Sequence, residues 1–235
     1  GNRVFTAADL AADGVKPIHV VSKFPGHRGA DYPHLATGKL RFVGEAVAVC
    51  LADTRAGAED LAVRTGLEFD PLPPVVDMLA ALEGTAARVH DDWEDNVILD
   101  SLFEGNPDGI KDGGVSVTRT FRMNRQAVNP LEGAAVLAEW DAREDRLVVH
   151  SASQIPHVLK NALCECLGLR QNQVRVVAPD VGGGFGYKCV LLPEEIFIPW
   201  VAMQVKRPVR WIQDRREHLV AGANAREHHY SVTLH

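Results

Sequence analysis

The chain has 235 residues, of which 46% are hydrophobic and 24% are charged, and its formal net charge is −6. This composition is typical of a folded globular protein, and the length predicts two domains rather than one. The negative charge, with no concentrated basic face, argues against a nucleic-acid partner. The sequence contains no run of eighteen apolar residues and no signal-peptide pattern, so we expect no membrane span.

The first part of the chain predicts a small α/β domain. Residues 41–51 form a strand-like run with an apolar second half, and Thr54 is suited to cap a helix that continues to about Arg64. Residues 67–70 follow as a short strand before several prolines. The order strand, helix, strand is typical of an α/β arrangement.

Residues 71–117 have a different composition, first rich in proline, then acidic, then rich in glycine. This pattern predicts an extended connector that passes between two domains. The acidic residues on both sides of Trp93 are more typical of a solvated surface than of a metal site, and we interpret them so.

The second part of the chain predicts a mixed α and β domain. Residues 134–140 and 146–150 indicate a hairpin. Apolar residues then recur at helical spacing over residues 155–167, with Ser153 suited to cap this helix and Gly168 to end it. A strand is expected at 173–178, and a helix that bends at Pro199 is expected at 194–205. A further strand is expected at 209–212.

Both ends of the sequence lack an evident partner strand. Residues 230–235 alternate as a strand that no hairpin partner accompanies, and nothing at the start is expected to pair with the first sheet. We therefore expect a piece of a longer polypeptide, or a chain whose partners supply the rest, because an open strand edge promotes aggregation.

The four cysteines, Cys50, Cys164, Cys166 and Cys189, form no C-x-x-C pair and no ligand set with histidine. Iron–sulfur, zinc and disulfide frameworks are therefore not expected within the chain, and a zinc protease is excluded by the lack of an H-E-x-x-H pair. A reducing compartment follows, so we expect a cytoplasmic location.

The most informative segment is the glycine-rich run 181–188, which contains Phe185 and follows the strand expected at 173–178. Glycine is favoured where the backbone must approach another group closely or adopt angles that a Cβ forbids. A loop of exposed amide N–H groups after a strand predicts a seat for an anionic or oxo-rich ligand, and the alternative is a connection that binds nothing. The run fits neither the P-loop pattern nor the dinucleotide fingerprint G-x-G-x-x-G.

Six segments together resemble one protein family, and the similarity extends over nearly the whole chain. The chain resembles the molybdenum-binding large subunit of the xanthine dehydrogenase, aldehyde oxidase and carbon monoxide dehydrogenase family. The segments that carry this resemblance are 39–48, 54–60, 69–77, 129–133, 153–157 and 181–186.

The resemblance implies an α+β fold made of two parts. Residues 1–72 are similar to the α/β-hammerhead domain of the family without its leading strands, and residues 73–117 would be an extended connector. Residues 118–235 are similar to the first part of a mixed α+β molybdopterin-binding domain.

The resemblance also implies the cofactor-binding residues. The segment Gly182, Gly183, Gly184, Phe185 and Gly186 matches the glycine loop whose backbone lies against an oxo ligand of molybdenum, with Phe185 beside the metal. Gln154 matches a glutamine that hydrogen-bonds an oxo group at the same centre. Neutral donors can hold an oxo ligand without competing for the metal, and Gln154 also precedes a helix N-terminus, which favours negative charge. The alternative for Gln154 is a surface cap.

Two further positions bear on the substrate. In similar purine hydroxylases a substrate-binding glutamate stands at the place of Cys189, and a thiol cannot accept two hydrogen bonds as a carboxylate does. We therefore do not expect xanthine as the substrate, and Cys189 is placed near the substrate, the alternative being a small buried side chain. Glu132 could face the site or be structural.

By resemblance, the complete enzyme would hydroxylate an aldehyde or a heterocycle with oxygen from water. Its molybdenum would be bound by molybdopterin in the cytosine dinucleotide form. The enzyme would be a hetero-oligomer that passes electrons to iron–sulfur clusters and FAD on partner subunits. The general-base glutamate lies in a part of the family that this chain does not contain, so we expect no catalytic residue and no direct metal ligand here. The chain alone is expected to be inactive.

Two other function classes remain open. The first is a non-catalytic assembly module that contributes part of the cofactor pocket and an interface, and the second is an unrelated α+β domain whose glycine loop holds another anion.

Overall fold

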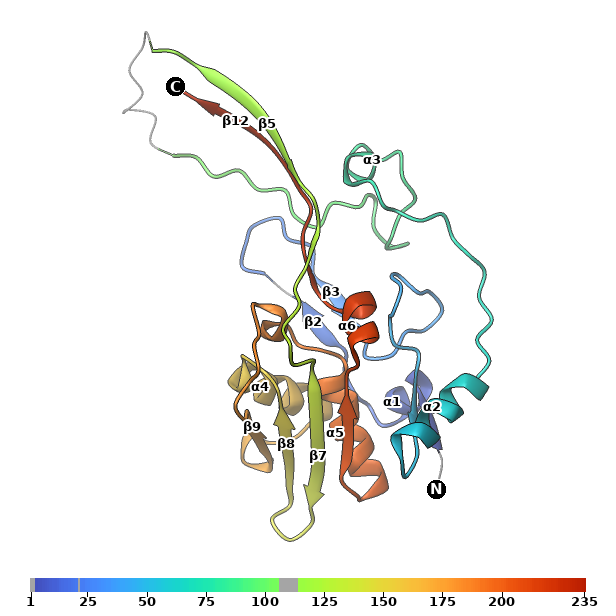
Figure 1. Cartoon of the computed structure of the whole chain (residues 1–235). Coiled ribbons are helices and arrows are strands. Elements are labelled where there is room, and N and C mark those ends of the chain that lie inside the picture. Colours follow the sequence, from blue (N-terminus) through green and yellow to red (C-terminus); the bar gives the residue numbers. More distant parts are fainter. Residues whose placement is uncertain (1–2, 21, 106–113) are drawn as a thin grey trace. The chain divides into compact units, whose positions relative to one another are not determined.

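The computed structural model describes residues 3–20, 22–105 and 114–235. These residues form two compact units (Figure 1). The first consists of Gly1–Ser101 with Glu165–Leu169, and the second of Leu102–Cys164 with Arg170–His235.

The first unit contains two small antiparallel sheets and three short helices. One sheet pairs β1 (Arg3–Thr6) with β4 (Ala48–Leu51), and the other pairs β2 (Ile18–Val20) with β3 (Ala30–Tyr32). The helices are α1 (Ala7–Ala12), α2 (Arg55–Arg64) and α3 (Met78–Leu82).

The helix predicted after Thr54 is confirmed as α2. The Thr54 hydroxyl accepts a hydrogen bond of 3.1 Å from the Gly57 amide, which satisfies one of the donors that a helix start leaves free. Within the segment expected to be extended, Asp77 caps the short helix α3 in the same manner, by accepting from the amides of Leu79 and Ala80.

Three expectations for this unit are wrong. The strand expected over 41–51 begins only at Ala48, because Gly44 adopts a left-handed φ of 95° that breaks an extended run. Residues 67–70 form no strand; Leu67 and Phe69 are exposed, and the prolines after Asp70 stop pairing. The start of the chain does pair with this sheet, since β1 lies antiparallel to β4.

The second unit is built on a four-stranded sheet of order β10-β7-β8-β9. The hairpin of β7 (Ala135–Asp141) and β8 (Arg146–Ser151) is confirmed, as are β9 (Val174–Val177) and β10 (Val209–Ile212). Strand β10 pairs antiparallel with β7, whereas β9 pairs parallel with β8.

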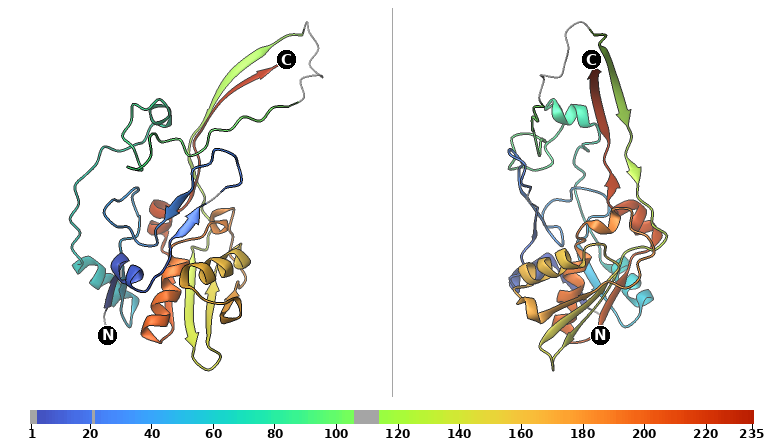
Figure 2. Two further views of the ribbon diagram at one scale, coloured as in Figure 1. Left: turned by 180° about the vertical axis from the view of Figure 1, so that it is seen from behind. Right: turned by 90° about the vertical axis from the view of Figure 1, so that its left-hand side faces the viewer.

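Helices α4 (Pro156–Leu167) and α5 (Glu194–Val205) lie on the same face of this sheet (Figure 1 and Figure 2). Both helices were expected from the sequence. Gly168 ends α4 with a left-handed φ of 66°, and the Ser153 hydroxyl accepts from the Ile155 amide just before the helix. Residues 195–202 of α5 are all buried, as expected of a helix that is apolar on every side. The core of the unit therefore lies between α5 and strands β7, β8 and β10.

The parallel pair of β8 and β9 fixes where functional side chains can lie. Helix α4 connects the two strands as a crossover, so both strands run in one direction and their carboxyl ends meet at one edge of the sheet. Gln154 follows β8, and the glycine loop follows β9. The topology therefore brings these two segments together, at the edge where ligands bind in open α/β sheets.

Short elements complete the second unit. They are the 3-10 turns η2 (Gln171–Gln173) and η3 (Tyr187–Cys189), helix α6 (Arg215–Ala221) and strands β6 (Gln126–Ala127) and β11 (Asn224–Ala225). Strands β6 and β11 pair antiparallel.

The expectation that the last strand lacks a partner is wrong. Strand β12 (His228–Leu234) pairs antiparallel with β5 (Val117–Met123) along its whole length. The two strands lie side by side as a long ribbon (Figure 1). Near its outer end, Thr118 and Thr233 pair although they are 115 positions apart in the sequence, and no local pattern signals such a pairing.

In the part of the chain that the structure describes, no helix is long and apolar enough to cross a membrane.

Candidate functional site

The loop after β9 carries a run of left-handed backbone angles. Gly183 has a φ of 97°, Phe185 of 52° and Gly186 of 85°. Glycine adopts such angles without strain, whereas a bulky residue does so at a cost of about 1–2 kcal/mol. Phe185 nevertheless leaves 77% of its surface exposed, so packing of its ring does not explain the strain. A strained residue with an exposed ring indicates a functional constraint on this turn.

Gln154 lies directly against the middle of the loop. A Cβ added to Gly184 would overlap the carboxamide of Gln154, and one added to Gly182 would stand 2.8 Å from the Cβ of Glu132. Only glycine therefore allows the backbone to approach these side chains so closely. The two candidate elements, which the resemblance places at one centre, are in contact.

A buried lysine holds the beginning of the loop through a carboxylate. The Glu132 Oε2 atom accepts a hydrogen bond of 2.6 Å from Lys188 Nζ and one of 2.8 Å from the Gly182 amide. The Lys188 side chain is only 1% exposed. The ammonium of Lys188, together with the Gly182 amide, holds the pKa of Glu132 below its ordinary value although partial burial acts in the opposite direction.

Lys188 also fixes the position of Gln154 through its main chain. Its carbonyl oxygen accepts a hydrogen bond of 2.9 Å from the Gln154 amide. One residue thus links the segment before α4, the glycine loop and the segment of Glu132. In this network the Glu132 carboxylate braces the loop, and a role of Glu132 facing the site stays a prediction.

Tyr187 anchors the loop to the interior of the unit. Its ring stacks on His218 with centroids 4.3 Å apart, and its hydroxyl accepts a hydrogen bond of 2.8 Å from Gln213 Nε2. Burial raises the pKa of the Tyr187 hydroxyl, so the phenol stays neutral. His218 donates from Nε2 to the Val128 carbonyl at 2.7 Å, which keeps its ring in place.

Helix α5 begins with two glutamates, and the second of them, Glu195, contacts the end of β8. Ser151 donates a hydrogen bond of 2.6 Å to Glu195 Oε1, and the Leu192 amide donates to the other oxygen at 3.0 Å. Burial raises the pKa of both carboxyls, that of Glu194 to about 7. The Glu195 carboxylate therefore braces the end of β8, and none of the bonds described links it to the loop.

The predicted site residues thus divide into two groups. Gln154 and Gly184 are in contact, and Gly182 and Gly183 form the braced beginning of the loop. Cys189 is exposed at the end of η3, and its amide donates to the Gly186 carbonyl at 3.1 Å. Sequence reasoning missed Lys188, because no periodicity links it to a partner 56 positions away.

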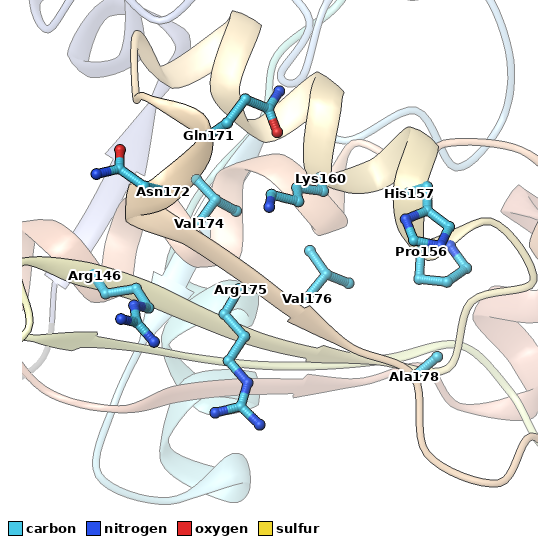
Figure 3. Close-up of a pocket in the computed structure, with 10 residues that line it drawn as sticks. All are labelled: Arg146, Pro156, His157, Lys160, Gln171, Asn172, Val174, Arg175, Val176 and Ala178. Atoms are coloured by element: carbon cyan, nitrogen blue, oxygen red, sulfur yellow. The ribbon is translucent and has the colours of Figure 1, made fainter.

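A separate cavity of about 590 Å³ lies along β9 and α4 (Figure 3). Four basic side chains, Arg146, His157, Lys160 and Arg175, are among its lining residues, and no acidic one is. Neither Gln154 nor the glycine loop lines this cavity, so it is distinct from the contact just described. Sequence reasoning did not predict it, because its lining comes from several elements.

The chemistry available at the loop is that of neutral hydrogen-bond donors. Backbone amides and one carboxamide can hold a terminal oxygen without adding charge. In the described part of the chain, no three His, Cys, Asp or Glu side chains are grouped so as to hold a metal ion. These donors therefore suit oxygen atoms already bound to a metal that other residues or a cofactor hold. They do not suit direct ligation of a metal ion.

Comparison with known proteins gives a consistent result. Residues 89–234 match the family model of the molybdopterin cofactor-binding domain. The chain is 32% identical to the nicotine 6-hydroxylase large subunit of Paenarthrobacter nicotinovorans, over 97% of this chain and 28% of that protein. It is 29% identical to the carbon monoxide dehydrogenase large chain of Hydrogenophaga pseudoflava, over 97% of this chain and 30% of that protein.

The solved structures agree with the sequence relatives. The quinoline 2-oxidoreductase of Pseudomonas putida 86 superimposes with a TM-score of 0.88 at 32% identity, over 98% of this chain and 29% of that chain. A Cu,Mo-containing carbon monoxide dehydrogenase gives a TM-score of 0.83 at 27% identity. The chain spans less than a third of the length of these relatives.

Proposed function

This chain belongs to the molybdopterin cofactor-binding domain family of molybdenum hydroxylase large subunits, and from this membership we propose that it forms one wall of the cofactor site in such an enzyme. The enzyme would hydroxylate an aldehyde or a heterocycle with oxygen from water.

The observation that carries the proposal is the contact between Gln154 and Gly184. The carboxamide occupies the space that any larger residue at position 184 would fill, and both lie beyond the carboxyl ends of parallel strands. Gln154 and the glycine loop together, here called the cradle, fit an oxo-bearing group, because their donors are neutral and the glycines leave the backbone amides accessible. Gln154, Gly182, Gly183, Gly184, Phe185 and Gly186 would hold the cofactor.

When bound, the molybdenum cofactor supplies oxygen transfer and accepts the two electrons of the substrate. The residues of this chain would orient that group. Gln154 would donate from its amide nitrogen, and the backbone amides of residues 184–186 would donate as well. The amides of Gly182 and Gly183 already donate to Glu132 and to the Val181 carbonyl. Lys188 and Glu132 would keep the loop in place by the bonds described above.

The remaining machinery is proposed to lie outside these 235 residues. The relatives are more than three times longer, and the general base would belong to their additional part. We propose that the pterin is a cytosine dinucleotide and that iron–sulfur and FAD subunits accept the electrons. Within the chain, residues 1–72 would form a hammerhead-like domain, 73–117 a connector and 118–235 the start of the cofactor domain. Its four free cysteines are compatible with the proposed cytoplasmic location.

Among possible substrates, a nitrogen heterocycle is favoured over an aldehyde. Two relatives at 32% identity are named for nicotine and for quinoline. Cys189, proposed to lie near the substrate, lacks the paired acceptors that would hold a purine. The substrate would therefore be a heterocycle bound mainly by its apolar faces.

The test is to purify the native assembly that contains this chain from a host that makes the pterin dinucleotide. Molybdenum per chain is measured by elemental analysis, and turnover of quinoline-type heterocycles is followed with a dye acceptor in ¹⁸O-labelled water. We expect stoichiometric molybdenum and incorporation of ¹⁸O into the product. Molybdenum without turnover would favour a non-catalytic assembly module, and a folded assembly without molybdenum would contradict the proposal.

A further inference from the structure

The ribbon of β5 and β12 is exposed almost throughout. Every residue of β5 is exposed, and in β12 only His228 is partly buried. A two-stranded ribbon is marginally stable in water by itself, because it buries too little apolar surface to offset the ordering of its backbone. A further element that covers one of its faces would supply the missing burial.

The register separates the side chains of the ribbon into two faces of opposite character. Residues directly opposite each other share a face, and faces alternate along each strand. One face carries only polar side chains, and the 3.0 Å contact between the hydroxyls of Thr118 and Thr233 shows that they lie together. Its members are Thr118, Thr120, Arg122, His229, Ser231 and Thr233.

The other face is predominantly apolar. Phe121 stands opposite Tyr230 at its centre, and Val117 stands opposite Leu234 at one end. Its other apolar members, Met123 and Val232, stand opposite its two polar members, His228 and Arg119. The apolar side chains are 39–70% exposed. A contiguous apolar patch of this kind marks an interaction surface, and isolated exposed apolar residues do not.

We propose that this apolar face is the docking surface for the additional polypeptide that large subunits of this family carry beyond the segment matched by this chain. The identity of the polypeptide that covers this face rests on the proposed function. The matched family segment includes both strands, while more than two thirds of each relative lies outside the match. Those relatives therefore hold enough further chain to cover the ribbon.

A second copy of this chain fits the face less well. Arg119 lies on the apolar face, opposite Val232, and the face contains no acidic residue. Two copies packed face to face would bury two guanidinium groups without a carboxylate, which is costly. The occupant should be mainly apolar and should offer an acceptor to Arg119.

The first experiment is site-specific photo-crosslinking in the native assembly. A benzoylphenylalanine is placed at position 121 or 230 on the apolar face, and at position 120 or 231 on the polar face as the matched control. We expect crosslinks from 121 and 230 to peptides of a molybdenum hydroxylase large subunit that lie outside these 235 residues, at least five times the yield from the controls. Crosslinks to a second copy, to an unrelated protein, or in equal yield from both faces would overturn the inference.

Hydrogen exchange supplies a second readout that does not depend on the crosslinking residues. The amides of 117–123 and 228–234 should exchange at least a hundredfold more slowly in the assembly than in the isolated chain. Phe121→Asp should abolish this protection, whereas Thr120→Asp should retain it. Equal exchange in both samples would refute the docking surface. Slow exchange of these amides in an assembly that lacks molybdenum would support the docking surface and contradict the proposed function.

Discussion

Lys188 donates through its ammonium to Glu132 and accepts through its carbonyl from Gln154. Since Glu132 in turn binds the Gly182 amide, removal of the ammonium should loosen the loop. Breaking a buried ion pair costs 3–5 kcal/mol, but Glu132 is 39% exposed and can rehydrate, so we expect Lys188→Met to lower the free energy of unfolding by about 2 kcal/mol. Urea unfolding measures this change.

The control for that variant is Lys23→Met at an exposed site, which should stay within about 0.5 kcal/mol of the wild type. A double-mutant cycle with Glu132→Gln should give a coupling free energy of about 1–3 kcal/mol between the two side chains. Strict additivity would show that the pair contributes nothing.

Gly184→Ala tests the cradle. The added methyl group would overlap the Gln154 side chain, which is exposed and can turn away, so we expect a loss of stability of at most about 1 kcal/mol. A second substitution, Gln154→Ala, should recover most of that stability, because it removes the overlapping carboxamide. The molybdenum content of Gly184→Ala, and of its combination with Gln154→Ala, should be at most about a tenth of the wild-type content. A tenfold loss corresponds to about 1.4 kcal/mol in the free energy of cofactor binding.

Gly66→Ala serves as the matched control, since no atom lies within 4 Å of its added Cβ. It should keep both stability and molybdenum content. If Gly184→Ala behaved in the same way, the close approach of the loop to Gln154 would have no functional meaning.

Phe185 is expected to lower the stability of the chain while it supports turnover of the assembly. Phe185→Gly relieves a left-handed backbone angle and loses an exposed ring, so we expect stability to rise by about 0.5–1 kcal/mol after the entropy of glycine is deducted. Phe185→Ala keeps the strain and should give no rise. Turnover of the assembly should fall in both variants, and thermal unfolding together with dye reduction would measure the two effects.

The pH dependence of stability should show the effect of Glu194. Burial raises the pKa of its carboxyl to about 7 in the folded chain, so the folded state favours the protonated form. Its stabilising contribution is complete below the ordinary pKa near 4.5 and is lost as the pH rises through 7. Glu194→Gln should therefore be more stable than the wild type at pH 8 by about 2 kcal/mol and equal to it near pH 4.5.

Thermal unfolding between pH 4.5 and pH 8.5 measures this difference. A gain of stability by Glu194→Gln at low pH would have the wrong sign and would contradict the assignment.

Local patterns in the sequence predict much of the second unit. The hairpin β7–β8 and helix α4 have clear periodicity, and Gly168 ends that helix as its chemistry requires. The first unit was harder, because Gly44 interrupts an apolar run that otherwise has the composition of one strand.

The candidate site could be predicted only in part, for a topological reason. The glycine loop can be recognised from its own residues, whereas Gln154 and its place at the same centre followed only from the resemblance to a known family. Their contact depends on the parallel pairing of β8 and β9, which the sequence does not display. The pairing of Lys188 with Glu132 depends on the same arrangement in space, so a search along the chain cannot find it.

The wide separation of β5 and β12 has a consequence for synthesis on the ribosome. Strand β5 emerges more than a hundred residues before its partner, which at 5–20 residues per second leaves it single for roughly 5–20 s. During that interval Val117, Phe121 and Met123 are available to chaperones and to neighbouring nascent chains. The yield of folded protein should therefore depend on translation speed downstream of codon 123 and on the supply of chaperones that shield single strands.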